Sequence, residues 1–442
     1  MENKREMGER NLLKTLKNVF SGNILTLMWT RLIFYFITRL YQDFFPFYIQ
    51  ALGGSSAEIG LVSSMAAFAS LIIVPISGYL ADHIGRVKLI VTAFLFRSAT
   101  FLIYAFSTNW VMLAFGNFYH GLSMYFQAAQ SALIADSLPP GRRAMGFATL
   151  NSLPQIVAIG APTVGAYMIT LYGIDLGMRY IFIIVFFGML AISVGRQVGL
   201  KETLKDTKSV SELKASFGGV RPLIKEAYKS SFSTLKWTPK SLAGFVVIEC
   251  LASFAGAMVG PFWGIYAKEI VNLSIADWAT IITMNSILLL VLSVPAGLII
   301  DKIGNRKTII AMLILSIFNG FLFTQSTSFM QTLAVMLYIT FISAFISPAA
   351  HAFVADIVPR EIRARITSAY GRGSIGIIGG VGGAGGGYVV AIPSLIGSIV
   401  GGVIYSFNPT YPWLIQTGFL AICFILGTLL LKETETPEVW AS

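Results

Sequence analysis

The sequence predicts an all-α integral membrane protein whose twelve transmembrane helices form two pseudo-symmetric six-helix bundles. Three observations lead to this fold class: the composition, the number of long apolar runs, and a repeat that relates the two halves of the chain. Of the 442 residues, 55% are hydrophobic and only 12% are charged, and the mean hydropathy is +0.73. Soluble domains carry about 25% charged residues, so lipid is expected to be the main solvent of this chain.

Twelve apolar runs are long enough to cross a bilayer, because a membrane-spanning helix needs about 20 mostly apolar residues. They fall at roughly 24–52, 59–81, 88–107, 110–137, 144–171, 178–199, 241–268, 275–300, 307–326, 330–357, 365–390 and 410–431. A polar stretch separates the first six runs from the last six. The predicted domains are a cytoplasmic N-terminus with a short amphipathic segment, the first bundle, an interdomain loop, the second bundle and a cytoplasmic tail, at 1–22, 23–199, 200–240, 241–431 and 432–442.

A net charge of +11 is compatible with a nucleic-acid partner, so the positions of the lysines and arginines along the chain matter. With the N-terminus inside, cytoplasmic segments hold 26 of the 32 lysines and arginines, external loops hold 2, and spans hold 4. Membrane proteins concentrate Lys and Arg in their cytoplasmic loops. The basic balance therefore indicates topology. We expect a monomer in the cell membrane with both termini cytoplasmic, the lipid bilayer as a partner and no nucleic acid.

A repeat relates the two halves of the chain. The segment Gly78–Lys88, between spans two and three, is matched by Gly297–Lys307, between spans eight and nine. The sequence Ala-Asp-x-x-Pro at 135–139, after span four, is matched at 355–359, after span ten. Two motifs that recur at nearly the same spacing along the chain indicate a duplicated six-helix unit, which is a known origin of transporter folds.

These motifs resemble those of the major facilitator superfamily. The similarity rests on Gly-x-Leu-Ala-Asp-x-x-Gly-Arg at 78–86 with its second copy, on both Ala-Asp-x-x-Pro segments, and on 46–53 followed by Glu58-Ile-Gly60. It covers roughly residues 24–431. The resemblance implies two bundles around a central site that opens to each side of the membrane in turn.

The resemblance also implies that the repeated loops latch the two halves together on the cytoplasmic side. Gly78 would allow close helix packing, and the Asp82 carboxylate could pair with a helix N-terminus or an arginine. The alternative is that these charges only set topology. The candidate gating residues are Gly78, Asp82, Gly85, Arg86, Asp136, Arg142 and Arg143 in the first half, and Asp301, Gly304, Arg306, Asp356 and Arg363 in the second.

Charged residues inside spans are the candidates for handling solute or protons, because a charge at the bilayer centre costs about 2.5–3.5 kcal/mol on insertion scales. Arg39 and Asp43 are one helical turn apart in the first span and should form an ion pair. They belong to a polar stripe at helical spacing that starts at Arg31, so this helix face should look into the protein. The alternative is a purely structural buried pair.

Glu249 is the second candidate for charge handling. It lies nine residues after Lys240, about 13 Å along the seventh span and thus near the middle of a bilayer core about 30 Å thick. No basic residue lies within a turn of it, so a protonatable carboxylate is expected there. The alternative is a pair with Arg39 across the cavity.

Uncharged polar residues complete the candidate solute and proton site. His120 and Gln127 lie in span four, Gln155 in span five and Asn285 in span eight. Amide and hydroxyl side chains often only bridge helices, so a structural role is the alternative for each. In proton-driven exporters of the resembled family, an arginine occupies the position of Asn117. Its absence here weakens the prediction of proton-driven export.

The eleventh span is the least regular part of the pattern. Ten glycines fall within 371–387, and a further apolar run at 392–407 precedes span twelve. Either a glycine hinge breaks span eleven, or the extra run is an external or re-entrant segment.

The sequence predicts a secondary transporter that moves a small organic solute by alternating access, coupled to protons, with efflux of amphipathic compounds slightly favoured. The alternatives are uptake of a polar metabolite, and a channel or sensor on the same fold. No nucleotide-binding loop, metal-ligand spacing or clustered nucleophile occurs, so neither enzymatic activity nor a cofactor is expected. Cys250 and Cys423 are expected to be buried thiols.

Overall fold

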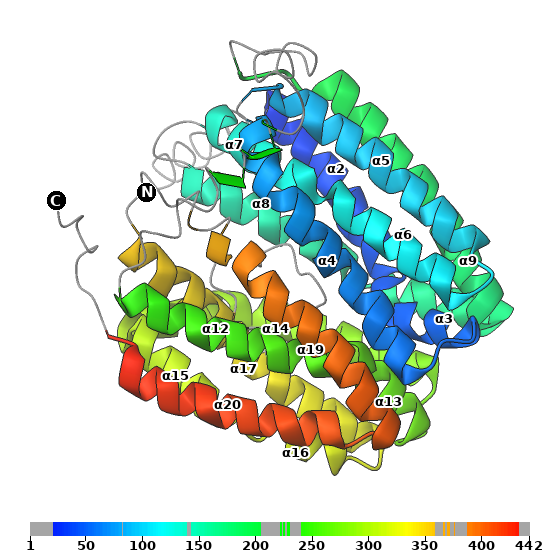
Figure 1. The fold of residues 1–442 in the computed structure, drawn as a ribbon, viewed down its shortest axis with the longest axis vertical. Coiled ribbons are helices and arrows are strands. Elements are labelled where there is room, and N and C mark those ends of the chain that lie inside the picture. The colour runs from blue at the N-terminus through cyan, green and yellow to red at the C-terminus, as the bar shows by residue number, and fades with distance from the viewer. Residues whose placement is uncertain are drawn as a thin grey trace, which may run out of the picture.

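A computed structural model describes residues 21–81, 83–138, 143–204, 240–358 and 387–432, with isolated positions between 222 and 229 and between 366 and 375. All regular elements within these residues are helices (Figure 1). The first half contains α2 (Gly22–Arg39), η1 (Gln42–Phe44), α3 (Phe45–Ala51), α4 (Ser56–Ala81), α5 (Arg86–Phe106), α6 (Trp110–Leu122), η2 (Ser123–Tyr125), α7 (Phe126–Ser137), α8 (Arg143–Ala158) and α9 (Ala161–Gly199). The second half contains α12 (Lys240–Val259), η4 (Gly260–Phe262), α13 (Trp263–Glu269), α14 (Ile275–Ile303), α15 (Asn305–Ser316), α16 (Asn319–Thr324), α17 (Phe329–Ile357), α19 (Tyr388–Phe407) and α20 (Tyr411–Leu430).

Ten stretches of helix in the described chain are long and apolar enough to cross a membrane. The predicted fourth span, which the short 3₁₀ turn η2 divides into α6 and α7, is not among them. The predicted fifth and sixth spans appear as one stretch, Thr149–Gly199, which turns at Gly173. Gly173 has φ 79°, a left-handed conformation that glycine adopts without strain.

The predicted boundary of span eleven is wrong. The described helix in this region is α19, which runs from Tyr388 to Phe407 rather than over 365–390. The run 392–407 is therefore neither external nor re-entrant, since it forms most of a 20-residue apolar helix that packs between α4 and α12. Close packing of this helix depends on glycine: a Cβ at Gly401 would collide with the carbonyl oxygen of Met258 in α12.

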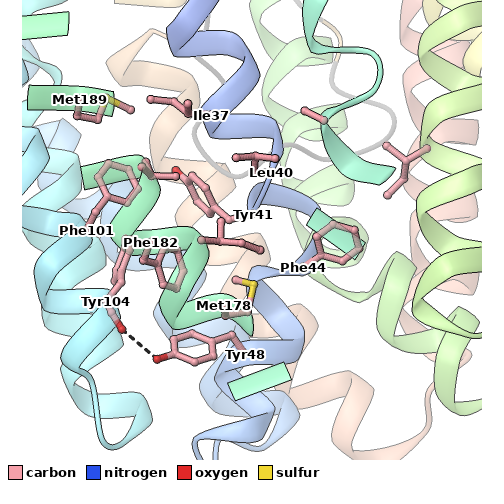
Figure 2. Packing of buried hydrophobic residues seen from close by; sticks show 14 of the residues in the cluster. Ile37, Leu40, Tyr41, Phe44, Tyr48, Phe101, Tyr104, Met178, Phe182 and Met189 are labelled. Atoms are coloured by element: carbon pink, nitrogen blue, oxygen red, sulfur yellow. Dashed lines mark hydrogen bonds between the residues drawn. The ribbon is translucent and has the colours of Figure 1, made fainter. Parts of the chain in front are cut away.

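The duplication is visible in the backbone. The first helix of each half breaks at a 3₁₀ turn, η1 at Gln42 and η4 at Gly260. Tyr48 in α3 and Tyr266 in α13 stand at the same position after these two breaks. They donate equivalent hydrogen bonds to the carbonyl oxygens of Tyr104 (3.0 Å) and Thr324 (3.2 Å). Figure 2 shows Tyr48 and Tyr104 in the aromatic core beside Phe182.

The two halves pack together mainly through α4 against α19 and α9 against α14. One cluster of buried apolar side chains extends from the first half into the α13 end of the second half, and includes Trp263 and Tyr266. The buried residues of a second cluster, which includes Phe245 and Ile346, all belong to the second half, and Leu71 of α4 packs against them. Among the described residues, the fully buried core that the two halves share lies at the end of the molecule where α3 and α13 lie, which the charge distribution assigns to the outside.

Candidate solute site and gates

The predicted ion pair in the first span is confirmed. Arg39 Nη1 lies 3.3 Å from Asp43 Oδ2, and the two side chains are 40% and 24% exposed. Asp43 belongs to the 3₁₀ turn η1, so the pair stands where the first helix breaks. A helix break exposes backbone polar groups inside the protein, and such breaks bind solutes and ions in transporters.

The Arg31 guanidinium fastens α2 to α8. Its Nη1 donates to the carbonyl oxygen of Leu150 at 3.0 Å and to Asn151 Oδ1 at 2.9 Å. Gln155 lies one turn further along α8, is exposed, and donates from Nε2 to the carbonyl oxygen of Asn151 at 2.9 Å. The polar stripe of α2 thus meets polar side chains of α8, as expected for a face that looks into the protein.

Glu249 is buried, with only 1% of its surface exposed. The ion-pair partner that the structure gives Arg39 is Asp43, on its own helix, so the pairing of Arg39 with Glu249 stays an alternative. Arg31 and Glu249 stand at the same position before the breaks η1 and η4. The duplicated first helices therefore carry opposite charges at equivalent positions.

The remaining candidate ligands are not joined to the Arg39–Asp43 pair by any hydrogen bond among the described residues. His120 Nε2 and Asn285 Oδ1 are buried without a hydrogen-bond partner in the part of the chain that the structure describes. Gln127 donates from Nε2 to the sulfur of Met124 at 3.4 Å. Asn117 has a structural role, because it accepts from the Tyr104 hydroxyl at 3.0 Å and donates to the carbonyl oxygen of Val62 at 2.6 Å.

Sequence reasoning missed a buried arginine in the first half. Arg196 is 1% exposed, and donates to Thr30 Oγ1 at 3.1 Å and to Gln130 Oε1 at 3.0 Å. Its guanidinium lies 3.9 Å from the centre of the Phe94 ring. The signal was an arginine near the cytoplasmic end of the apolar run 178–199, sixteen residues after an uncharged stretch begins at Tyr180. Neither Arg196 nor the buried Arg97 has a carboxylate partner among the described residues, so polar and aromatic groups solvate both cations.

The first repeated loop ties helices of its own half together. Arg86, which follows Gly85 at the start of α5, forms an ion pair with Asp136 at the end of α7. The same guanidinium donates to Thr203 Oγ1 at 3.0 Å. Gly85 has φ 101°, a left-handed conformation that lets the chain turn directly into α5.

Glu202 also belongs to this cluster and was missed by sequence reasoning. Its carboxylate accepts from the backbone N–H groups of Val87 (2.9 Å), Thr203 (3.0 Å) and Leu204 (3.1 Å). Glu202 thereby caps the start of α5, where Gly85 has no side chain to do so. Burial raises the pKa of Glu202, but the backbone donors of Leu204, Val87, Arg86 and Thr203 together lower it below its ordinary value of 4.5.

In the second repeated loop, a hydrogen bond from a neutral side chain replaces the ion pair of the first loop. Asn305, which follows Gly304 at φ 94°, donates to Asp356 Oδ2 at 2.8 Å, where the first half has an ion pair. Arg306 instead donates to the carbonyl oxygen of Leu431 at the end of α20, at 2.6 Å. Asp301 is exposed and makes no ion pair with a described residue.

Several candidate gating residues are not located by the structure. Asp82, Arg142 and Arg363 lie outside the described residues. Gly78 lies within α4 and Arg143 begins α8, but the surroundings of neither are described. The described contacts of Arg86, Asn305 and Arg306 remain within their own halves, and the latch between the halves stays a prediction.

The predicted external end holds the polar contacts between the halves. Gln50 Nε2, at the end of α3, donates to Glu269 Oε1, at the end of α13, at 2.8 Å. Lys268 Nζ lies 5.4 Å from the centre of the Phe47 ring. Deeper between the halves, the hydroxyl oxygens of Thr163 in α9 and Thr283 in α14 are 3.1 Å apart. The ends of the two broken helices therefore close this side of the molecule.

Comparison with known proteins agrees with this architecture. The family model described as Major Facilitator Superfamily matches residues 27–248 and 245–442. YhjO of Bacillus subtilis, an uncharacterised transporter of this type, is 29% identical over 44% of the chain, which spans only 46% of that protein. The multi-drug resistance efflux pump PmrA of Streptococcus pneumoniae is 23% identical over 81% of the chain and 85% of its own length. The arabinose-proton symporter of Bacillus subtilis is 23% identical over 86% of the chain and 85% of its own length.

The fold is also that of solved transporters. The crystal structure of the nucleoside transporter NupG superposes with a TM-score of 0.66, over 94% of this chain and all of NupG, at 14% identity. A family model that covers both repeated halves, the duplicated helix breaks and the matching fold lead to one assignment. The chain belongs to the Major Facilitator Superfamily.

Proposed function

We propose that the chain is a proton-coupled exporter that moves a small organic solute by alternating access. The observation that carries this proposal is the unequal distribution of contacts between the halves. Gln50–Glu269 and Lys268–Phe47 join the halves at the predicted external end, whereas the described loop contacts at the other end stay within each half. This state would offer the central site to the cytoplasm, where an exporter collects its solute.

The Arg39–Asp43 pair is the proposed solute-facing group. Both side chains are partly exposed at a helix break, so a solute could exchange places with one partner at low cost. Glu249 is the proposed proton carrier. A carboxylate that is 1% exposed in an apolar span is costly while ionised, and protonation removes this cost. His120, Gln127, Gln155 and Asn285 are proposed as further ligands of the solute.

The opposite state requires a seal at the predicted cytoplasmic end. We propose that the repeated loops then form the latch that their motifs predict, with Asp82 and Asp301 as its carboxylates. The weaker second loop supports an unequal latch, because Asn305 stands where the first half has Arg86. Asp301 is exposed in this structure and thus available for a new partner.

Counterflow in proteoliposomes tests the transport proposal. Labelled ethidium, an aromatic cation, would be exchanged against excess unlabelled ethidium, and labelled arabinose would be tested in parallel, since one relative is a named efflux pump and another a named sugar symporter. Ethidium counterflow with accumulation driven by a pH gradient supports proton-coupled export. Counterflow of arabinose alone would replace this proposal with uptake, and the absence of counterflow with either probe would indicate that neither is carried.

A further inference from the structure

An apolar groove lies on the second half of the protein, between helices α12, α19 and α20. It has a volume of about 420 Å³ and is lined by side chains of α12, α19 and α20, among them Cys250, Leu251 and Phe254, Ile392 and Ile396, and Phe419. The rings of Phe254 and Phe419 form one wall, with centroids 5.0 Å apart. Cys250 is half-buried here, which corrects the expectation that this thiol is buried.

The lining excludes a polar solute. Sites for small polar molecules combine an apolar wall with a few placed polar groups that fix orientation. The lining side chains of this groove are hydrocarbon except for the Cys250 thiol, so nothing in it would orient a charge or a hydrogen-bonding group. A flexible hydrocarbon chain needs no such group.

The groove reaches from the inner half of the bilayer core to just past its middle. Helices α12 and α19 both begin at the predicted cytoplasmic end, at Lys240 and Tyr388. At 1.5 Å per residue, Cys250 lies about 15 Å and Ile392 about 6 Å along their helices. The groove therefore extends from the inner leaflet to just past the middle of a core about 30 Å thick.

Glycine contacts close the groove at its deep end. A Cβ at Gly397 would collide with the carbonyl oxygen of Phe254, so α19 and α12 touch through their backbones at this level. Towards the cytoplasmic end the larger side chains of Ile392 and Ile396 replace glycine, and both are about half exposed, at 50% and 46%. The groove is thus closed at its deep end, and towards the cytoplasmic end it is continuous with the apolar surface that faces lipid.

We propose that this groove holds one acyl chain of an inner-leaflet phospholipid. The membrane supplies this occupant at every moment, the lining fits it, and the closed end limits how far the chain enters. The proposal rests on the membrane fold and does not depend on the solute or the driving ion. Because α19 also packs on α4 through Gly402 and Gly60, the bound chain lies directly below a contact between the two halves.

Photocrosslinking in vesicles tests this proposal. The full chain would be reconstituted in phosphatidylethanolamine and phosphatidylglycerol with a small fraction of phosphatidylethanolamine that carries a diazirine on its acyl chain. Mass spectrometry should find severalfold more label per exposed residue at 250–254 and 392–396 than at the apolar surface around Val198, which is 83% exposed. Label spread in proportion to exposure would overturn the proposal.

A groove-filling variant provides the matched comparison. Ile396→Trp should reduce this label severalfold, whereas Val403→Trp, at a 43% exposed position of α19 outside the lining, should leave it unchanged. Leu251→Phe serves as a second filling variant, and a melting curve shows which variants fold. Unchanged label in a folded filling variant would contradict the proposal. Displacement of the label by ethidium would assign the groove to solute and also overturn it.

Discussion

The carboxylate of Glu202 accepts a hydrogen bond from the backbone N–H of Val87, a residue 115 positions earlier in the chain, at 2.9 Å. This contact folds the segment after α9 back onto the start of α5. The neighbouring Arg86–Thr203 hydrogen bond and the Arg86–Asp136 ion pair reinforce it. The beginning of the interdomain loop is therefore anchored to the first half in this state.

Removing this cap should loosen the start of α5. Glu202→Ala should cost about 1 kcal/mol of local stability, as the loss of a helix cap does. Hydrogen–deuterium exchange at 86–90 should then become about fivefold faster. Lys201→Ala is the control, since Lys201 contributes only backbone groups to this cluster. Equal exchange in both variants would show that Glu202 does not hold the helix start.

The stabilising effect of the Glu202 carboxylate should be lost at low pH. The pKa of Glu202 is lower in the folded protein than its ordinary value of 4.5, so its stabilising effect is present above pH 4.5 and lost as pH falls through the folded pKa. Protection at 86–90, corrected for intrinsic exchange, should drop in wild type below pH 4.5. Glu202→Ala should lack this step; a step of equal size in the variant would point to another group.

The Arg39–Asp43 pair should matter for transport more than for stability. Asp43→Asn removes a partly exposed pair worth about 0–1 kcal/mol, so the melting temperature should change little. Counterflow should nevertheless fall at least tenfold if the pair contacts solute. Asp175→Asn breaks the i,i+4 pair of Asp175 with Arg179 outside the candidate site and should leave counterflow intact. Similar counterflow in the two variants would remove Asp43 from the site.

Glu249→Gln separates a proton carrier from a structural charge. As a proton carrier, Glu249 changes charge during the cycle, so the variant should fold and exchange solute but lose accumulation driven by a pH gradient. As half of a buried ion pair, its loss should cost about 3–5 kcal/mol and lower the melting temperature. Stability, exchange and accumulation are to be measured on one preparation. A stable variant that still concentrates solute would end the proton proposal.

The Gln50–Glu269 contact should hold the predicted external side closed. Gln50→Ala removes the donor, so this side should open more often. In a protein with Cys250 and Cys423 replaced, Thr163→Cys should react faster with an impermeant maleimide added outside. Gln325→Ala, an exposed glutamine at the same end, is the control. No change in the rate for Gln50→Ala would show that the apolar contacts alone close this end.

Gly401 and Gly60 both lie in tight helix contacts, but replacing each with alanine should have different effects on stability. Gly401→Ala places a methyl group against the Met258 carbonyl within one half, and overpacking of this kind costs about 1–3 kcal/mol. It should lower the melting temperature. Gly60→Ala meets Ser398 across the two halves and should shift the population of states with a smaller loss of stability. Gly418→Ala, which meets nothing within 4 Å, should be silent. Equal melting temperatures and equal rates of maleimide labelling for Gly60→Ala and Gly418→Ala would contradict a tight contact between α4 and α19.

Features that depend on composition, or on neighbours along one helix, were predictable from the amino-acid sequence. Apolar runs predict membrane spans because each must satisfy its own backbone hydrogen bonds in lipid. The repeat predicts two similar halves because duplicated sequence folds to duplicated structure, as the paired breaks η1 and η4 show. The Arg39–Asp43 pair was predictable because residues four apart on a helix are neighbours.

Which helices meet, and at what level in the membrane, became clear from the packing of the folded chain. Gln50 and Glu269 lie in different halves of the chain, and Arg196 and Gln130 lie in different helices, so no local pattern brings either pair together. The position of α19 was missed because the predicted run 365–390 includes the glycine-rich stretch, whereas the described helix begins after it, at Tyr388, and packs against Gly60 and Met258. Hydropathy places a residue in the membrane, but the partner that a buried charge finds there depends on how rigid helices pack, which sequence period alone does not specify.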